Sequence, residues 1–144
     1  MVGNARDAAG GCASATPGKD SPCLEYQTYL FNTGAVEVVA ITAPTLNFVP
    51  GRGLQFAVSL DDQPPQKVDV VSAHANAADS NRDWEKSVEA NARYATTKLN
   101  VPKSGYHTLK LWMIDPGVVL QKIVVDLGGL KPSYLGPPES YRKR

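Results

Sequence analysis

Apolar and polar residues alternate with a period of two along most of the chain, the pattern of β-strands that bury one face. The clearest run spans Leu54 to Leu60, in which every second residue is large and apolar and would face a core. The residues between them, predicted to face away from that core, are Gln55, Ala57 and Ser59. Similar runs cover residues 24–31, 35–42, 66–71, 94–101, 107–114 and 118–127. The pattern predicts an all-β protein.

Turn-forming residues between these runs indicate how the strands connect. Asn32-Thr33-Gly34 separates the first two runs, which predicts that residues 24–31 and 35–42 form a β-hairpin. Asp115-Pro116-Gly117 separates the last two runs. Because these two runs are apolar on much of both faces, we predict that 107–114 and 118–127 are central strands, each covered on two sides.

One segment departs from the strand pattern. Within residues 76–92, Ser80 or Asn81 is suited to cap a short helix that places Trp84, Val88 and Ala92 on one face. The charged residues of this helix suit a surface element lying across the end of a sheet. Strands separated by Gly and Pro turns, with one short surface helix, predict an antiparallel β-sandwich of the jelly-roll type. The sequence does not alternate strands with long helices, which argues against a doubly wound nucleotide-binding fold.

The two ends of the chain differ in composition from its middle. The chain has 144 residues, which suits a single domain. Residues 1–20 contain almost no large apolar side chain, so we predict a flexible arm over 1–22, a folded domain over 23–139 and a short tail over 140–144. No signal peptide with a basic start and an apolar core opens this chain.

The charges of the chain are nearly balanced. It has 15 Lys and Arg against 14 Asp and Glu, a formal net charge of +1. Nucleic-acid binding requires a concentrated basic face, so we expect no nucleic-acid partner. The apolar runs are far shorter than the ~20 residues of a membrane-spanning helix. We therefore expect no membrane partner either.

The two cysteines leave two interpretations open. Cys12 and Cys23 form a small disulfide loop if the compartment is oxidising, or they are two unrelated free thiols. No histidine has the spacing to complete a zinc site with them. Calcium between Glu25 and Asp126 would have two carboxylates, well short of the roughly six to eight oxygens that this ion takes. We assign no metal and no cofactor.

The sequence contains no recognisable catalytic pattern. Gly51-Arg52-Gly53 leads into a strand rather than a helix, which argues against a phosphate-binding loop. Asp61-Asp62 precede Gln63-Pro64-Pro65 and Asp115 precedes Pro116-Gly117, so these carboxylates are interpreted first as turn residues. His107, at the start of a strand, is interpreted as a structural hydrogen-bonding residue rather than a base. We expect a domain with no catalytic residues of its own.

Aromatic residues give the better functional signal. Trp112 lies on the same strand face as Thr108 and Lys110, where its ring could stack on the apolar face of a sugar while polar neighbours bind the hydroxyls. A competing interpretation is that the predicted helix or another domain covers Trp112. Trp84 also has two interpretations: its ring stacks on a ligand, or it anchors the predicted helix.

Several segments in a fixed order carry a family resemblance. They are Leu24-Glu25-Tyr26, Pro44-Thr45-Leu46-Asn47-Phe48, Phe56-Ala57-Val58-Ser59-Leu60-Asp61-Asp62-Gln63-Pro64-Pro65-Gln66, Asn81-Arg82-Asp83-Trp84, Gly105-Tyr106-His107-Thr108-Leu109-Lys110, Trp112-Met113-Ile114-Asp115-Pro116-Gly117-Val118-Val119-Leu120-Gln121-Lys122 and Gly128-Gly129-Leu130-Lys131-Pro132-Ser133-Tyr134-Leu135-Gly136-Pro137-Pro138. Together, over residues 24–139, they resemble the C-terminal domain of glycoside hydrolase family 115, the xylan α-glucuronidases. The arm that holds both cysteines is not matched to a family pattern.

The resemblance implies a parent enzyme that removes glucuronic acid, or its 4-O-methyl form, from the side branches of xylan. In that family the catalytic residues lie in upstream domains, so none is carried onto this chain. The family's C-terminal domain is a β-sandwich similar to carbohydrate-binding modules, and it takes part in packing and dimer formation. A parent enzyme of this kind is expected to be secreted or periplasmic.

Two functions follow as hypotheses. The first is a carbohydrate-binding module that holds a xylan-type polysaccharide or oligosaccharide, such as glucuronoxylan, near the upstream catalytic domains. Its candidate binding residues are Trp112, Trp84, Tyr106 and Asn81, with Lys110 or Arg82 as a cationic partner for acidic groups. The second is a structural domain, without sugar binding of its own, that packs on the catalytic domains or forms a homodimer. The apolar run 118–125 and the Pro-rich segment 130–139 favour this second function.

Overall fold

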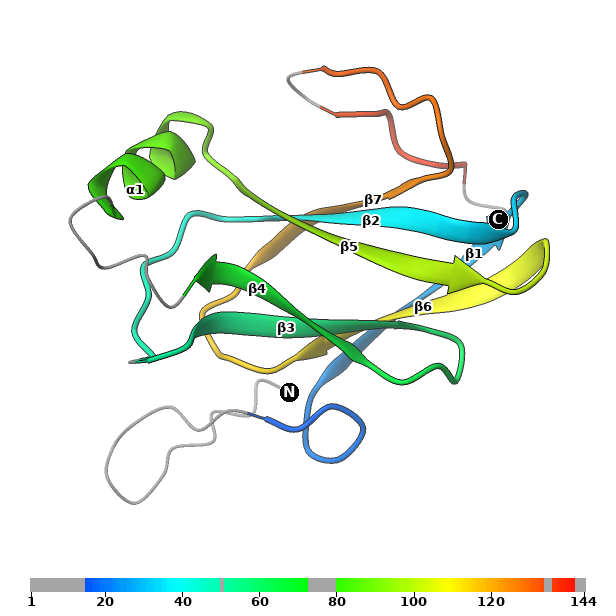
Figure 1. Cartoon of the computed structure of the whole chain (residues 1–144), viewed down its shortest axis with the longest axis horizontal. Helices are drawn as coiled ribbons and strands as arrows, with labels where there is room; N and C mark the ends of the chain where they lie inside the picture. Colours follow the sequence, from blue (N-terminus) through cyan, green and yellow to red (C-terminus); the bar gives the residue numbers. More distant parts are fainter. Residues whose placement is uncertain (1–14, 50, 73–79, 134–135, 142–144) are drawn as a thin grey trace.

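The computed structural model describes residues 15–49, 51–72, 80–133 and 136–141 (Figure 1), with the side chains of Ser80 and Asn81 excepted. Its elements are β1 (Cys23–Leu30), β2 (Gly34–Thr42), β3 (Gly53–Leu60), β4 (Gln66–Ser72), α1 (Ser80–Glu89), β5 (Arg93–Val101), β6 (Gly105–Met113) and β7 (Leu120–Asp126). Of the predicted arm and tail, only residues 15–22 and 140–141 are described. Residues 15–22 run beside the end of β6, where the amide of Ala15 donates to the carbonyl of Ile114 at 2.8 Å.

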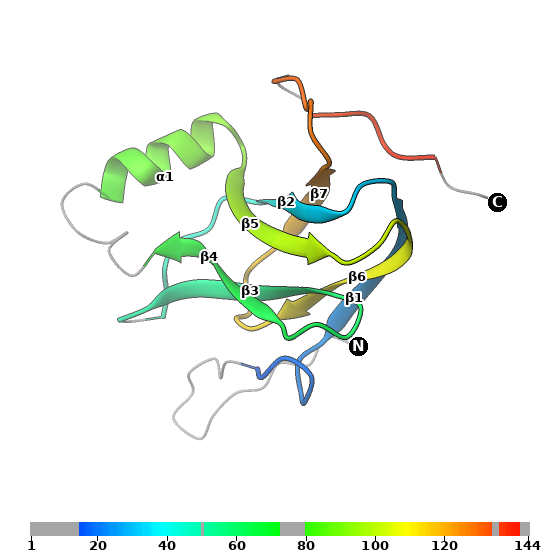
Figure 2. The same ribbon diagram turned by 45° about the vertical axis from the view of Figure 1, so that its right-hand side comes forward.

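The strands form two antiparallel sheets that pack face to face (Figure 2). One sheet has four strands in the order β1-β6-β3-β4, and the other has three in the order β5-β2-β7. Among the described residues α1 is the only helix, and it lies beyond one end of the strands (Figure 1). The prediction of an all-β antiparallel sandwich with one short surface helix is confirmed.

The predicted hairpin of the first two strands is wrong. β1 pairs with β6, whereas β2 pairs with β5 and β7 in the other sheet. The connection at Asn32-Thr33-Gly34 therefore crosses between the sheets, and the Asn32 side-chain amide donates to the carbonyl of Leu127 at 2.8 Å. Alternation tells which face of each strand is buried but not which strand lies beside it, so the short connection misled the prediction.

The prediction that the last two strands are both central holds only for β6. It lies between β1 and β3, whereas β7 is an edge strand of the three-stranded sheet. The second apolar face of β7 has another cause. Val124 is buried on the outer face of this sheet, and Lys122 beside it donates to the carbonyl of Pro137 at 3.5 Å. The C-terminal segment folds back along the outside of the sheet (Figure 1), so a coil, rather than a central position, accounts for the second apolar face of this strand.

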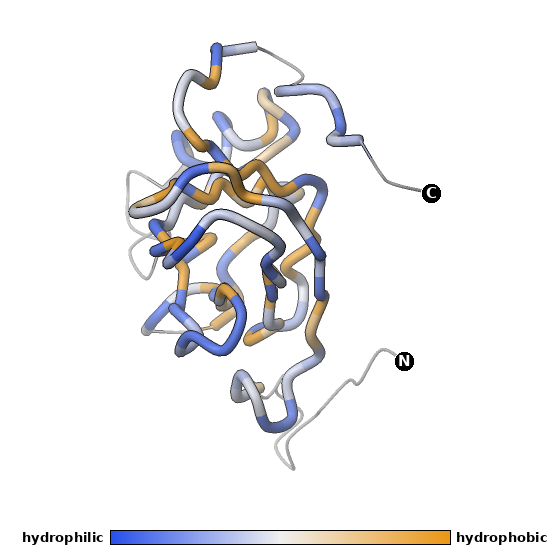
Figure 3. Tube along the Cα trace, turned by 90° about the vertical axis from the view of Figure 1, so that its right-hand side faces the viewer, coloured by the Kyte–Doolittle hydropathy of each residue, from blue (hydrophilic) through white to orange (hydrophobic). Residues whose placement is uncertain are grey.

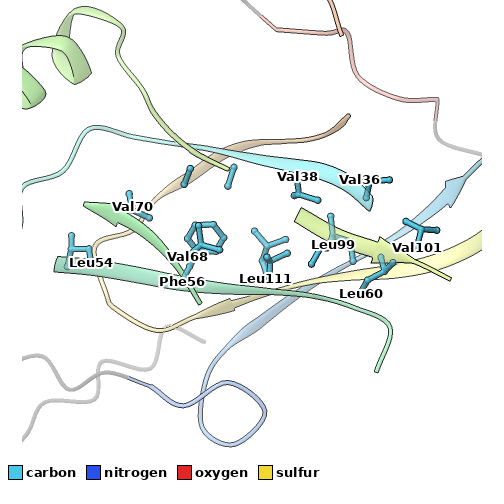
Figure 4. Packing of buried hydrophobic residues seen from close by; sticks show 14 of the residues in the cluster. Val36, Val38, Leu54, Phe56, Leu60, Val68, Val70, Leu99, Val101 and Leu111 are labelled. Carbon is cyan, nitrogen blue, oxygen red and sulfur yellow. The ribbon is translucent and has the colours of Figure 1, made fainter. Parts of the chain in front are cut away.

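The hydrophobic core lies between the two sheets, where apolar side chains of both point toward one another (Figure 4). Hydrophobic positions recur along the backbone of these strands (Figure 3). Leu54, Val58 and Leu60 of β3 are fully buried, as predicted, and each contributes roughly 1.5–3 kcal/mol of transfer free energy. Ala57 and Ser59 were predicted to face away, but they are buried too. They lie on the outer face of a central strand, where side chains of the neighbouring strands cover them.

The helix α1 is fastened by charge more than by an apolar face. Buried Arg93, at the start of β5, donates to the Asp83 carboxylate at 2.7 Å and to the carbonyl of Thr45 at 3.2 Å. The predicted apolar face is wrong in part, because Val88 is 50% exposed and Ala92 is buried only beyond the end of the helix. Val88 lies in the last turn of the ten-residue helix. In the described part of the chain, no helix is long and apolar enough to cross a membrane.

Candidate functional site

The outer face of the four-stranded sheet gathers the aromatic and polar side chains that best form a binding surface. On β6, the residues whose side chains point into the core are His107, Leu109 and Leu111. Because side chains alternate along a strand, the residues between them point outward: they are Tyr106, Thr108, Lys110 and Trp112. Three sequence candidates, Tyr106, Lys110 and Trp112, thus share one face of one strand.

Trp112 is half-buried at the end of this row. It lies opposite Cys23 of β1 and Ala57 of β3, and its indole N–H donates to the hydroxyl of Ser59 at 3.1 Å. That bond satisfies the one polar group of the indole and fixes the orientation of the ring on the sheet. The predicted helix does not cover Trp112, because α1 lies at the end of the other sheet (Figures 1 and 2). The remaining alternative is a cover supplied by another domain.

Lys110 stands in the middle of the outward row. Its register partners are Glu25 on β1 and Ser59 on β3, and its ammonium lies 3.7 Å from the carboxylate of Asp62. Because Asp62 is fully exposed, this ion pair is weak and the ammonium remains able to bind an acidic ligand. The cation is therefore placed among hydrogen-bonding groups rather than neutralised by a buried partner.

Cys23 lies at the end of the same face and carries a free thiol. Burial raises the pKa of this thiol, and the nearby Glu25 carboxylate raises it further. A thiol with a raised pKa is a weak nucleophile at neutral pH. Cys12, the other candidate for a disulfide, lies outside the described residues.

Three aromatic rings cluster at the opposite end of the row. Tyr29 lies opposite Tyr106 in the β1–β6 register, with ring centroids 5.1 Å apart, and the rings of Tyr29 and Phe31 are 4.9 Å apart. All three are exposed: Tyr29 by 45%, Phe31 by 74% and Tyr106 by 73%. We call Tyr29, Phe31 and Tyr106 the aromatic cluster. Tyr29 and Phe31 were not among the candidate residues, because only the pairing of β1 with β6 brings them to Tyr106.

The remaining candidates lie on α1, away from this face. Arg82 is exposed on the helix, and Trp84 is half-buried, its carbonyl accepting a hydrogen bond from the Ser87 hydroxyl at 2.7 Å. The helix backbone includes Asn81, whose side chain is outside the described set. The six sequence candidates therefore divide into a β6 group and an α1 group, and the structure does not bring the two groups together.

Two ion pairs fasten β6 to β3 at the two ends of the site. Near the start of β6, the buried His107 ring lies 2.7 Å from the Asp61 carboxylate through Nδ1 and 2.8 Å from the Lys103 carbonyl through Nε2. Both neighbours are acceptors, so both ring nitrogens donate only when the imidazole is protonated. The bond to Asp61, followed by that to Lys103, raises the pKa of His107. Its interpretation as a structural residue agrees with this geometry.

Asp61 occupies the turn after β3 with a positive φ of 51°. Burial alone would raise the pKa of its carboxyl group, but the hydrogen bonds from His107 and from the amide of Thr108 outweigh burial and lower it. Its second oxygen accepts from that amide at 2.9 Å. Asp61 thus does more than shape its own turn, because it ties that turn to β6.

The second ion pair joins Arg52, just before β3, to Asp115, just after β6. The guanidinium of Arg52 binds both carboxylate oxygens of Asp115, at 2.7 and 2.5 Å. The amide of Gln55 also donates to Asp115 at 2.8 Å, and the carboxylate is 0% exposed. The hydrogen bonds with Asp115 raise the pKa of Arg52. Turn chemistry alone does not account for Asp115, since its partner lies 63 residues away.

No metal site forms among the residues that the structure describes. Within them, no three His, Cys, Asp or Glu side chains come together in a way that could hold an ion. Glu25 and Asp126, considered for calcium, lie on strands of different sheets, where their register partners are Lys110 and Glu37.

Comparison with known proteins bears on this sandwich as a whole. Residues 7–139 match the family model described as the glycosyl hydrolase family 115 C-terminal domain. The chain belongs to this family. The resemblance seen over residues 24–139 is confirmed, and the match extends into the N-terminal segment that contains Cys12.

A solved structure with a similar fold is that of BtGH115A, a family GH115 4-O-methyl-alpha-glucuronidase with specificity for decorated arabinogalactans. The two chains are 24% identical with a TM-score of 0.61, over 74% of this chain and 13% of BtGH115A. This likeness concerns the fold. The chain thus spans only a small part of that enzyme's length. No curated protein matches the chain.

Proposed function

We propose that this domain is a non-catalytic carbohydrate-binding module of an α-glucuronidase, and that it binds its ligand on the outer face of β6. The observation that carries the proposal is the position of Trp112, oriented by Ser59 on a sheet face that also presents Lys110 and Thr108. An indole ring stacks on the apolar C–H face of a sugar, while nearby polar groups bind its hydroxyls. Of the candidate groups, the β6 group has this combination on one surface.

The ligand that we propose is a polysaccharide that carries glucuronic acid, with glucuronoxylan as the first choice. Lys110 supplies a cation for the acidic branch, because its pairing with exposed Asp62 is weak. The family's name and the similar fold of BtGH115A support a parent glycoside hydrolase. Because BtGH115A is described as specific for decorated arabinogalactans, an arabinogalactan belongs beside xylan among the ligands to be tested. In this proposal the upstream catalytic domains are the partners, in a secreted or periplasmic enzyme.

One observation favours a structural function as the second candidate. Leu24 and Tyr26 of the edge strand β1 lie on the core side of their sheet, yet they are 51% and 41% exposed. β7, at the edge of the other sheet, leaves Ile123 and Val125 only partly buried. An open apolar edge of this kind suits packing against catalytic domains or a second copy. Self-association of the isolated chain in sedimentation, without retention by any polysaccharide, would favour this function.

Replacing Trp112 with alanine tests the binding function. We expect glucuronoxylan affinity to fall roughly tenfold or more, as for an aromatic residue that supplies a main contact to a ligand. The measurement is titration calorimetry with glucuronoxylan, arabinoxylan, an arabinogalactan and cellulose, with thermal unfolding to verify the fold. Trp112→Phe keeps a ring but loses the hydrogen bond to Ser59, so its affinity should lie between those of the unmodified protein and Trp112→Ala.

Trp84→Ala is the matched control, because it removes the same residue type from α1. We expect its affinity to equal that of the unmodified protein. If Trp84→Ala abolishes binding and Trp112→Ala does not, the site lies on the helix and the β6 assignment is wrong. If the unmodified protein itself binds none of these polysaccharides, the carbohydrate-binding function is wrong.

A further inference from the structure

The aromatic cluster and Trp112 lie on one face of the same strand pair, at its two ends. Tyr106 and Trp112 are six positions apart on β6, with side chains on the outer face. At about 3.3 Å per residue the two positions are roughly 20 Å apart. This distance is several times the length of one pyranose ring, so no single sugar contacts both.

Hydrogen-bonding side chains fill the interval between these aromatic ends. Thr108 and Lys110 point outward from β6, and their register partners on β1 are Gln27 and Glu25. Both β1 side chains are exposed. From one end of this face to the other, aromatic side chains are therefore followed by polar side chains and then by an aromatic side chain again. That order matches a sugar chain, whose apolar ring faces stack on aromatic residues and whose hydroxyls bind to polar ones.

The aromatic cluster has no role in the sandwich core. The ring of Tyr29 contacts the other two edge to face, with interplanar angles of 61° and 86°, and all three rings remain largely in solvent. Large exposed apolar groups that lie together mark binding surfaces more often than singly scattered ones do. Two of the three rings carry hydroxyls, which favours a ligand with both apolar and hydrogen-bonding groups.

We propose that the outer face of β1 and β6 is one extended site with two aromatic anchors, Trp112 and the aromatic cluster, and that its ligand is a polysaccharide chain lying along β6. This inference rests on the proposed carbohydrate-binding function and goes beyond it by assigning Tyr29 and Phe31 as binding residues and by making Tyr106 part of a second anchor. A site of this length binds internal stretches of a chain rather than a terminal sugar. Lys110, between the anchors, is positioned for an acidic branch of the bound chain.

Two anchors on one ligand give a length dependence that one anchor does not. A short oligosaccharide reaches one anchor, whereas a longer one reaches both, and the second contact is then intramolecular. We expect affinity to rise at least roughly tenfold once the chain spans both anchors, and to level off beyond that length.

The experiment is calorimetry of the full chain with xylo-oligosaccharides from xylobiose upward, unsubstituted and bearing glucuronic acid. The test variant is the double substitution Tyr29→Ala with Tyr106→Ala, which removes exposed rings and should not disturb folding. Its matched control is Tyr94→Ala, which removes a tyrosine of exposure intermediate between those of Tyr29 and Tyr106 from β5 in the other sheet. We expect the double variant to bind long oligosaccharides only as tightly as short ones, and Tyr94→Ala to retain the length dependence.

The outcomes separate this inference from the proposed function. If affinity does not depend on length, or if the double variant binds long chains normally while Trp112→Ala does not, the extended site is wrong and the Trp112 site stands. If no oligosaccharide binds to any of these proteins, both are wrong. If the double substitution leaves sugar binding unchanged but abolishes self-association in sedimentation, the aromatic cluster is a protein interface and the inference is overturned.

Discussion

Replacing Arg52 with methionine is expected to lower the free energy of unfolding by about 3–5 kcal/mol, the largest effect that we predict for this domain. The substitution removes the guanidinium that binds both oxygens of Asp115, whose carboxylate is 0% exposed. The buried charge then loses its cation while the amide of Gln55 remains bonded to it. Arg52 is 34% exposed, but the carboxylate is not; removing the partner of a buried charge costs far more than the pair contributes, because the desolvated charge remains.

A double-mutant cycle with Asp115→Leu separates these contributions. Removing both charges leaves no unpaired buried ion, so the double variant should be more stable than Arg52→Met alone. Urea unfolding followed by circular dichroism gives each free energy. Arg82→Met is the matched control, because Arg82 is exposed on α1, and it should change stability by less than about 0.5 kcal/mol. Equal effects of Arg52→Met and Arg82→Met would show that the Asp115 ion pair does not stabilise the fold.

Sequence patterns predicted the strands and their buried faces but not their neighbours. Leu54 to Leu60 shows why, since its alternation depends only on the contrast between core and surface. The partners of β3 are β4 and β6, and β6 begins some 45 residues further along the chain. Local turn signals contain no information on such distant pairing. The β1–β2 hairpin failed for this reason, and the edge position of β7 was missed because a coil covers its second face.

Because local patterns do not reveal strand pairing, they identified only part of the candidate site. Trp112, Lys110 and Tyr106 were found because they share the period of one strand, which is a local property. Tyr29 and Phe31 were missed because they join Tyr106 only through the β1–β6 register. The ionic partners of the site were missed likewise, since Arg52 and Asp115 are 63 positions apart. What the sequence could not supply is long-range pairing, and pairing is what assembles this face.

The two ion pairs hold β6 against β3 at both ends of the proposed site. Arg52 precedes β3 and Asp115 follows β6, while Asp61 follows β3 and His107 stands near the start of β6. Antiparallel pairing places these ends beside each other. The strand that carries Trp112, Lys110 and Tyr106 is thereby fastened at each end by a charged, partly or wholly buried contact. Such fastening holds β6 in fixed register with β3, as a preorganised binding surface requires.

The Asp61–His107 pair should make stability depend on pH. The pKa of His107 is raised above its ordinary value of 6.5, so its contribution is complete below that pH and is lost as pH rises through the higher folded value. The pKa of Asp61 is lowered below its ordinary value of 3.8, so its contribution is complete above that pH and is lost on acidification through the lower folded value. The pair therefore stabilises the domain most between these two ordinary values. Lys103, next to the imidazole, opposes its protonation in part.

Replacing His107 with alanine is expected to lower the free energy of unfolding by about 2–3 kcal/mol near pH 6, the second largest effect that we predict. The loss combines the charged hydrogen bond to Asp61 with the bond to the Lys103 carbonyl. The difference between the unmodified protein and the variant should shrink as pH rises from 6.5 through the higher folded pKa, because the unfolded chain loses its imidazolium proton first and the folded protein loses it only at the higher pH. Urea unfolding at a series of pH values from acid to alkaline measures this difference.

Asp61→Asn and Asp62→Asn form the matched pair for the same experiment. Asparagine tolerates the positive φ of Asp61, so this substitution removes the charge without straining the turn. It should abolish most of the pH dependence assigned to His107, whereas Asp62→Asn, at a fully exposed side chain, should change stability by less than about 0.5 kcal/mol. If the stability difference between the unmodified protein and His107→Ala is the same at every pH, His107 is not held as an imidazolium. The start of β6 would then be fixed by packing and by the Asp61–Thr108 bond rather than by charge.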